Sequence, residues 1–122
     1  MEDDLHSSLP LSPATLHILL SLAGEDLHGY GIMQEVARQS EGKYKLGPGT
    51  LYDNLQKLIQ REWVEELGRR AGDEDPRRRY YRLTLDGQGV LEAEIARLSQ
   101  VVREARSRLQ LARSPAAKPR RA

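Results

Sequence analysis

Apolar side chains recur every three or four residues in four segments of the chain, which is the spacing of one face of a helix. The first segment begins at Ser12-Pro13. This pair favours a helix start, because Ser caps free amides and Pro suits the first helical position. Its apolar stripe ends before Gly24, which we expect to close the helix in a left-handed conformation. Two further helices are predicted over residues 29–40 and 48–61.

The pattern changes to two short strand-like runs at residues 63–67 and 80–84. The residues between them are rich in Gly, Pro and charge, so the runs predict a β-hairpin with a long charged loop. One long helix is then predicted from residue 84 or 86 to about residue 113. Three helices, a hairpin and a long helix are the order of a winged helix-turn-helix followed by a C-terminal helix. We expect a mainly α fold with a small β-hairpin, in a chain whose 122 residues suit one domain.

These elements divide the chain into four parts. Residues 1–11 are polar and acidic and predict a flexible N-terminal arm. Residues 12–84 form the winged helix domain, and residues 85–113 form the long helix. Residues 114–122 are basic and interrupted by Pro, which predicts a disordered tail.

The helix predicted over residues 48–61 has two different faces. One face is apolar, and the other carries Thr50, Asn54 and Lys57 at spacings of three or four residues. A recognition helix needs such a polar face, with base-reading residues near its N-terminus. Gly47 and Gly49 leave the first amides of this helix open to a phosphate oxygen. Taken alone, however, this helix fits an ordinary surface helix with a polar face better.

The hairpin loop favours a nucleic-acid partner. It contains five arginines, whose side chains can contact a phosphate backbone or reach into a minor groove: Arg69, Arg70, Arg77, Arg78 and Arg79. Acidic residues interrupt them, so a solvated charged loop is the competing interpretation, mainly for the tip. Tyr30 and Tyr52 stand early in two helices, where a hydroxyl can bond a phosphate, or where the ring can simply pack.

The long C-terminal helix has an apolar seam. Its residues advance by alternating steps of four and three, the heptad pattern of paired helices: Leu91, Ile95, Leu98, Val102, Ala105 and Leu109. A helix of this length spans roughly 40 Å, which is more than a small domain needs for its own core. We therefore expect a homodimerisation helix; the alternative is a helix folded back on its own domain.

Composition excludes several classes of protein. There is no Cys, which removes disulfides, thiolate catalysis and cysteine-based metal sites. No apolar run reaches the roughly 18 residues of a membrane span, and the acidic start is unlike a signal peptide, so we expect a soluble, cytoplasmic protein. The three histidines lack ligand spacing, and Glu92 and Glu94 are expected to be solvated surface residues. No enzyme and no cofactor are expected, and the net charge of +1 does not by itself indicate nucleic-acid binding.

Three segments together carry a family resemblance. The sequences HGYGI at residues 28–32, LGPGTLY at 46–52 and RRYYRLT at 78–84, followed by Gly87, resemble the PadR-type repressors. The long helix is similar in kind to the single C-terminal helix of the shorter branch of that family. The family commonly has Gly where this chain has Glu62, and a left-handed helix end would be strained for Glu there.

The resemblance implies a dimeric winged helix repressor that is released by a small-molecule effector in many family members. It implies that Tyr30, Thr50, Tyr52 and Lys57 face double-stranded DNA, with the hairpin arginines on its backbone. Two such units in one dimer predict an inverted-repeat operator. The alternative function is a winged helix used for protein–protein contact without DNA binding.

Overall fold

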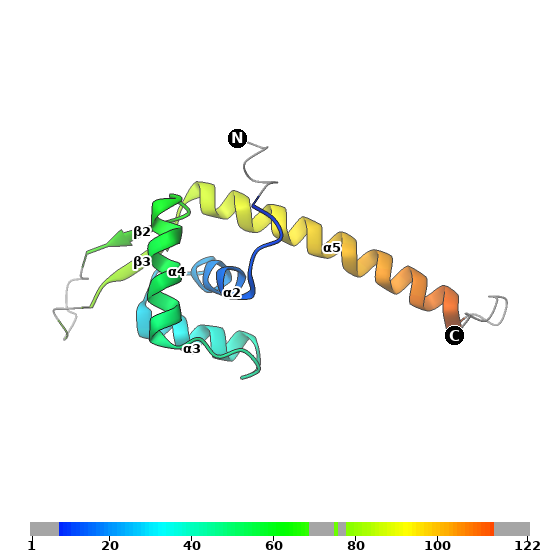
Figure 1. Cartoon of the computed structure of the whole chain (residues 1–122), viewed down its shortest axis with the longest axis horizontal. Coiled ribbons are helices and arrows are strands. Elements are labelled where there is room, and N and C mark those ends of the chain that lie inside the picture. Colours follow the sequence, from blue (N-terminus) through cyan, green and yellow to red (C-terminus); the bar gives the residue numbers. More distant parts are fainter. Residues whose placement is uncertain (1–7, 69–74, 76–77, 114–122) are drawn as a thin grey trace.

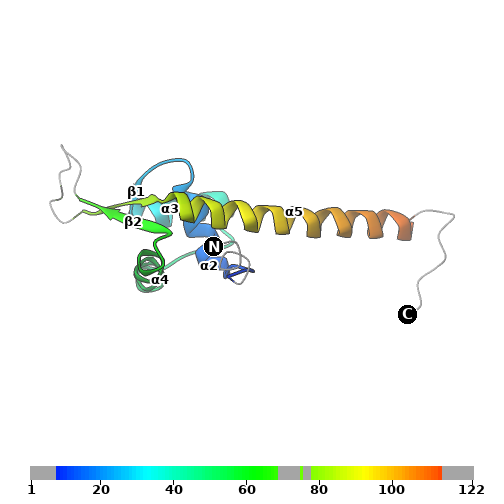
Figure 2. The ribbon, with the colours of Figure 1, turned by 90° about the horizontal axis from the view of Figure 1, so that it is seen from above.

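The computed structural model describes residues 8–68, 75 and 78–113. The expected C-terminal tail and most of the expected N-terminal arm lie outside these residues. The described elements are, in order, α2 (Pro13–Leu22), β1 (Leu27–His28), α3 (Gly29–Gln39), α4 (Pro48–Gln60), β2 (Val64–Leu67), β3 (Tyr80–Leu83) and α5 (Leu85–Arg113). Figure 1 labels all of them except β1, which is labelled in Figure 2. The predicted helices and both predicted strands are present, so the mainly α fold with a small β-hairpin is confirmed.

The sheet has one strand more than the hairpin predicted from the sequence. β1 pairs antiparallel with β3, and β3 pairs with β2, giving the order β1-β3-β2. β1 has only two residues and runs directly into α3, so it offers no alternating pattern that periodicity could detect. The strand fixes the start of α3 beside the hairpin.

The expected start of α2 is confirmed, but its expected end is wrong. The Ser12 side chain accepts a hydrogen bond from the Thr15 amide, and Pro13 occupies the first helical position. At the other end, Ala23 keeps a right-handed conformation and its amide bonds the Leu20 carbonyl. Gly24 is not in the left-handed region, because this tighter last turn ends the helix without a left-handed residue.

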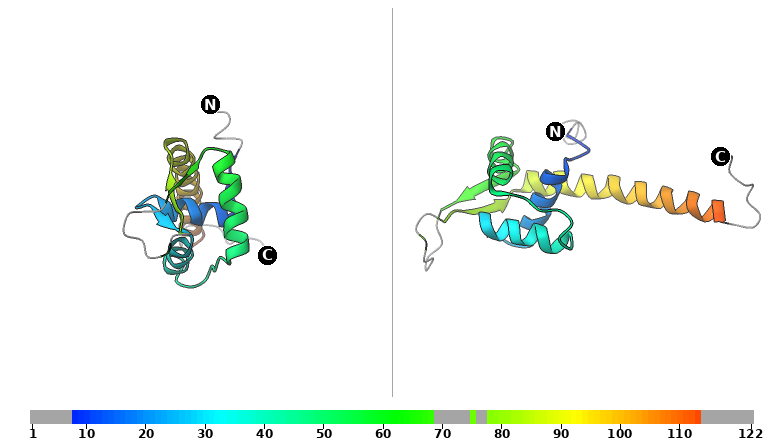
Figure 3. Two further views of the ribbon diagram at one scale, coloured as in Figure 1. Left: turned by 90° about the vertical axis from the view of Figure 1, so that its left-hand side faces the viewer. Right: turned by 60° about the horizontal axis from the view of Figure 1, so that its bottom comes forward.

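An aliphatic core joins the three helices of the winged helix domain to the sheet and to the start of α5. Its fully buried side chains come from four helices and one strand: Ile18, Leu19, Ile32, Val36, Leu51, Leu55, Val64 and Val90. The predicted apolar face of α4 lies in this core, so its opposite face is turned to solvent. Figure 3 shows α4 standing along one side of the domain, next to the hairpin.

The segment expected to be a flexible arm is attached at its C-terminal end. Leu11 packs against the core, and its amide donates a 2.9 Å hydrogen bond to the Glu94 carboxylate. The expectation that Glu94 is a solvated surface residue is wrong, because its side chain is fully buried. Arg97 satisfies the buried carboxylate with an ion pair of 2.6 Å.

Only the first part of α5 packs on the domain. From Ser99 to Arg113 every residue is exposed, and the helix leaves the domain in the direction away from the hairpin (Figure 2). The alternative of a helix folded back entirely on its own domain is therefore wrong. None of the described helices is both long and apolar enough to cross a membrane.

Candidate nucleic-acid interface

The start of α4 presents its first amides without a side-chain cap. Gly47 is the N-cap residue and makes no capping hydrogen bond, and Pro48 follows at the first helical position. The next residues, Gly49 and Thr50, are exposed. Free amides at the positive end of a 13-residue helix attract an anionic oxygen, as the sequence predicted for this segment.

The polar face of α4 is only partly free. Asn54 is half-buried, and its side-chain nitrogen donates a 2.8 Å hydrogen bond to the Thr50 carbonyl one turn earlier. Lys57 is exposed. Both residues border a hollow of about 490 Å³ that is closed on its other side by the chain from Ser8 to Ser12. Thr50 does not line this hollow, so the three predicted residues share a helix face but not one environment.

Tyr30 and Tyr52 are brought together at the start of α3. Tyr30 is 61% exposed and Tyr52 is 49% exposed, so neither residue is buried. A Cβ atom at Gly29 would lie 2.2 Å from the Tyr52 hydroxyl. A side chain at position 29 would displace the Tyr52 ring, so glycine at this position lets Tyr52 lie against the first turn of α3.

A hollow of about 280 Å³ is lined by side chains from the three segments that carry the family resemblance. It is lined by His28, Gly29, Tyr30, Tyr52, Asp75, Arg78, Arg79 and Tyr81. Tyrosine and arginine side chains therefore border one small space beside α4, together with the acidic Asp75. Hydroxyl and guanidinium groups both bind phosphate oxygens well. Arg77, also predicted for this interface, lies outside the described residues, as do Arg69 and Arg70.

Two acidic residues on β2 face opposite sides of the sheet. Glu66 lies 3.6 Å from Arg79, next to the hollow. Glu65 lies 3.6 Å from Arg82, which also makes a bidentate contact with Asp26. The hydrogen bond to Asp26 raises the pKa of Arg82 above its ordinary value. Unlike Arg79, Arg82 does not line the hollow. The sequence placed both glutamates in a strand but assigned neither to the interface.

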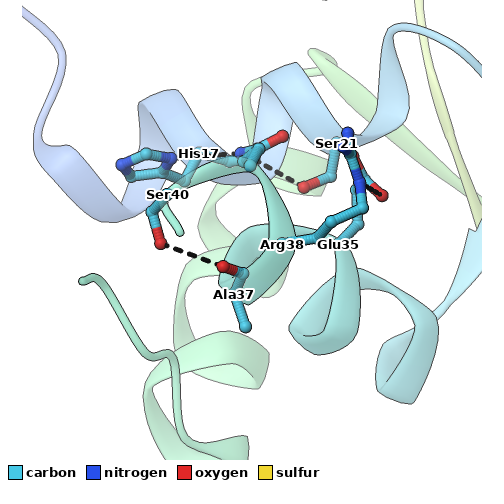
Figure 4. A network of polar contacts seen from close by, with 7 residues as sticks. His17, Ser21, Glu35, Ala37, Arg38 and Ser40 are labelled. Atoms are coloured by element: carbon cyan, nitrogen blue, oxygen red, sulfur yellow. Dashed lines mark hydrogen bonds and ion pairs between the residues drawn. The ribbon is translucent and has the colours of Figure 1, made fainter. Parts of the chain in front are cut away.

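A polar network holds the turn between α3 and α4. The Ser40 hydroxyl bonds both the amide and the carbonyl of Tyr44, and the Tyr44 ring stacks on His17 at 4.9 Å. Figure 4 shows the surrounding contacts, in which Ser21 bonds the His17 carbonyl and Ser40 reaches Ala37. These contacts tie the turn to α2, and so they set where α4 begins.

Glu62 connects α4 to the hairpin in a left-handed conformation, with φ of 64°. The expected left-handed helix end is therefore confirmed. This conformation is less favourable for glutamate than for glycine. Two hydrogen bonds from Thr84 fasten this connection. The Thr84 hydroxyl donates to the Glu62 carbonyl, and the Thr84 amide donates to the Trp63 carbonyl.

The predicted seam of α5 divides into two parts. Leu91 is only 4% exposed and belongs to the core of its own chain, and Leu98 is half-buried. Ile95, Val102 and Leu109 are each close to half exposed, and Ala105 is exposed. Exposed apolar stripes of this kind are typical of protein interaction surfaces. Among the described residues, no group of His, Asp and Glu is arranged to hold a metal ion.

The family of PadR-like transcriptional regulators matches residues 18–93 of this chain. The transcriptional regulator Rv3488 of Mycobacterium tuberculosis is 34% identical over 89 residues, which are 73% of this chain and 78% of that protein. An uncharacterised 37.1 kDa transposon protein of Streptomyces fradiae is 37% identical over 89 residues, covering 70% of this chain. The match spans only 24% of the length of that second relative.

Solved structures share the fold at low sequence identity. A PadR family transcription regulator of Clostridium difficile superposes with a TM-score of 0.68 at 21% identity, covering 80% of this chain and 99% of that one. PadR of Bacillus subtilis in complex with operator DNA superposes with a TM-score of 0.58 at 21% identity, covering 66% of this chain and 45% of that one. BpsR of Bordetella bronchiseptica, whose DNA binding is regulated by 6-hydroxynicotinic acid, superposes with a TM-score of 0.61 at 16% identity. The match covers 84% of this chain and 75% of that one.

Proposed function

This chain belongs to the PadR-like family of transcriptional regulators, and we propose that it is a homodimeric repressor that binds a specific DNA operator. One observation carries the proposal. Tyr30, Tyr52, Arg78 and Arg79 come from three distant segments and line one hollow beside the exposed face of α4. The likeness to B. subtilis PadR, solved with operator DNA, supports the same partner for this fold.

In this proposal α4 enters the major groove by its N-terminal half. Thr50 and Asn54 lie nearest the base edges, because they are uncharged and stand in the first two turns of the helix. Lys57 contacts a phosphate from the same face. The amide of Gly49 and its neighbours at the uncapped helix start bind a second phosphate oxygen.

The hairpin base contacts the backbone next to α4. Arg78 and Arg79 bind phosphate oxygens, and Arg77 is assigned to the same backbone from the sequence. The hydroxyls of Tyr30 and Tyr52 bond the phosphate that lies over the hollow. These contacts carry no sequence information, and they set the position in which α4 reads the bases.

The dimer forms along α5. The seam of Ile95, Leu98, Val102, Ala105 and Leu109 packs against the same seam of a second copy. Leu91, which the sequence also assigned to this seam, is instead buried in the core of its own chain. Two copies of α4 then lie on one face of the duplex. The operator is an inverted repeat whose half-sites are about 10 bp apart, or a multiple of that distance.

A small-molecule effector relieves repression. The likeness to BpsR, whose DNA binding responds to 6-hydroxynicotinic acid, supports regulation of this kind for the present fold. The protein acts on DNA in the cytoplasm, without a cofactor and without catalysis.

A gel-shift assay with the DNA upstream of the protein's own gene, at two salt concentrations, tests the proposal. Wild-type protein and Asn54→Ala are compared on this DNA and on a scrambled duplex. Loss of a base contact weakens operator binding by roughly 1–3 kcal/mol and affects the scrambled duplex much less. Lys57→Ala weakens binding to both duplexes and reduces the salt slope by about one.

The other candidate, a winged helix used for protein–protein contact, rests on the net charge of only +1. It predicts no shift of any duplex, even at low salt. Equal losses on both duplexes for Asn54→Ala would leave DNA binding in place but would remove Asn54 from base recognition.

A further inference from the structure

Glu66 places a negative charge where the proposed function needs a positive surface. Its carboxylate oxygen Oε1 lies 3.6 Å from Nε of Arg79, and Arg79 lines the hollow at the hairpin base. Glu66 pairs with Tyr81 across β2 and β3, so its side chain is on the same face of the sheet as the Tyr81 ring. The side chain of Glu66 is 47% exposed and that of Arg79 is 50% exposed, so both can reach a ligand.

The field of Glu66 extends into the hollow itself. Tyr81 lines the hollow, and its pKa is raised, first by burial and next by the negative charge of Glu66. Arg79 partly opposes this effect. A phosphate oxygen bound at Arg79 would have to displace Glu66 or share the guanidinium with it, and the two anions would repel each other.

We propose that Glu66 limits the affinity of this protein for DNA by competing with a backbone phosphate for Arg79. The inference rests on the proposed function, because it assigns a role within the same surface. Since phosphate contacts carry no sequence information, Glu66 lowers the affinity for operator and for unrelated DNA by the same factor. The protein therefore dissociates from DNA more readily than its arginines alone would allow.

Glu65 is a matched control in the same strand. It also lies 3.6 Å from an arginine and is 51% exposed, but it faces Arg82 on the opposite side of the sheet. Glu65→Gln and Glu66→Gln change the net charge by the same amount. Any gain from the change in net charge alone is therefore equal in both variants. The variants differ in which arginine loses a neighbouring carboxylate, Arg79 for Glu66→Gln and Arg82 for Glu65→Gln.

The experiment measures binding by fluorescence anisotropy at roughly 50 and 200 mM salt, a range over which phosphate contacts change strongly. The probes are the duplex from upstream of the protein's own gene and a scrambled duplex. Glu66→Gln is expected to bind both duplexes about fivefold more tightly at the lower salt, the effect of one exposed ion pair at its strongest. Glu65→Gln is expected to gain less than about twofold. Glu66→Ala, a second variant, is expected to reproduce the gain of Glu66→Gln.

Arg79 supplies the decisive comparison. In an Arg79→Gln background, Glu66→Gln is expected to gain no more than Glu65→Gln does, because there is no guanidinium left to release. Equal gains for the two glutamate variants, or a Glu66 gain that persists without Arg79, would overturn the inference while DNA binding itself stands. If neither wild-type protein nor any variant binds either duplex at the lower salt, the proposed function fails and the role of Glu66 fails with it.

Discussion

The two halves of α5 share one apolar stripe and have opposite surroundings. In the first half Val90, Leu91 and Glu94 are buried by the helices of their own chain. In the second half Val102 and Leu109 continue the same stripe, and they are 45% and 53% exposed. The helix has 29 residues and is about 44 Å long, and the winged helix domain covers only its beginning.

The ion pairs of α5 repeat this contrast. Glu94 and Arg97 form a pair in which the carboxylate is fully buried and also accepts the Leu11 amide. Glu104 and Arg108 form a similar pair in the second half, with both side chains largely exposed. The first half therefore stabilises the fold of one chain, whereas the second half is available to another chain.

The largest effect is expected from charges placed in the exposed stripe. Val102→Asp combined with Leu109→Asp is expected to dissociate the proposed dimer, because each substitution buries an unpaired carboxylate at a cost of about 3–5 kcal/mol. Light scattering at micromolar concentration should then fall from twice the chain mass of 13.8 kDa to that mass. Circular dichroism should still report a folded winged helix domain.

Gln100→Asp combined with Ser107→Asp is the matched control for this variant. These residues have the same spacing of seven and the same change of charge, but they stand on the opposite face of α5. The control is expected to remain a dimer. A wild-type protein that is monomeric across the micromolar range would contradict the proposed role of the second half.

A smaller effect is expected from removing volume in the buried stripe. Leu91→Ala should lower the free energy of unfolding by about 2–5 kcal/mol, because it leaves a cavity in the core of the chain. The loss should be the same at every protein concentration. Val102→Ala should instead lower the melting temperature by an amount that depends on protein concentration, since it acts on association. Thermal melts of both variants over a hundredfold range of concentration distinguish the two cases.

The next largest effect on stability is expected from neutralising the buried carboxylate of Glu94. Glu94→Gln is expected to cost about 1–3 kcal/mol of unfolding free energy at neutral pH, because Arg97 loses a charged acceptor. The hydrogen bond from Arg97 lowers the pKa of Glu94, the Leu11 amide lowers it further, and burial opposes both. Because this pKa is lowered, the ionised Glu94 carboxylate stabilises the fold fully above the ordinary glutamate pKa of roughly 4.3. This stabilisation disappears as the pH falls through the pKa of Glu94 in the folded state.

Urea denaturation of the wild type and Glu94→Gln between pH 7 and pH 3 measures this dependence. The difference between the two proteins should be constant down to about pH 5 and should then shrink. A difference that grows in acid would mean that burial dominates over Arg97 and that the pKa of Glu94 is raised.

The contrast within α5 also shows what the sequence could predict. Apolar spacing predicted the helices and the seam, because it reports which face of a helix avoids water. It could not predict which chain covers that face, so Leu91 and Val102 were both assigned to the dimer seam. Glu94 was assigned to the surface because the groups that satisfy its carboxylate cannot be paired with it from periodicity. One is the amide of Leu11, which lies 83 residues away, and the other is the guanidinium of Arg97.

The candidate interface was predictable as a set of residues but not as an arrangement. Tyr30, Tyr52 and the hairpin arginines were recognised from their chemistry and position. Their meeting in one hollow depends on β1, whose two residues have no periodic pattern, and on the close contact of Tyr52 with Gly29. Alternation places Glu65 and Glu66 on opposite faces of a strand, but only the register with β3 decides which of them faces Arg79.

The smallest effect is expected from the exposed ion pair, and it is the strictest test of the contrast between the halves. Glu104→Gln removes the same charge as Glu94→Gln and also deprives an arginine on the same helix of its acceptor. Its cost should stay below about 0.5 kcal/mol, because water solvates both side chains and screens their attraction. Its contribution should vanish at high salt, whereas that of Glu94 should persist because the carboxylate is shielded from ions. Urea denaturation of both variants at low and high salt, each at pH 7, measures the two costs. Equal costs would mean that a partner chain buries Glu104 as fully as the domain buries Glu94, which would extend the dimer contact from the stripe to the flank of α5.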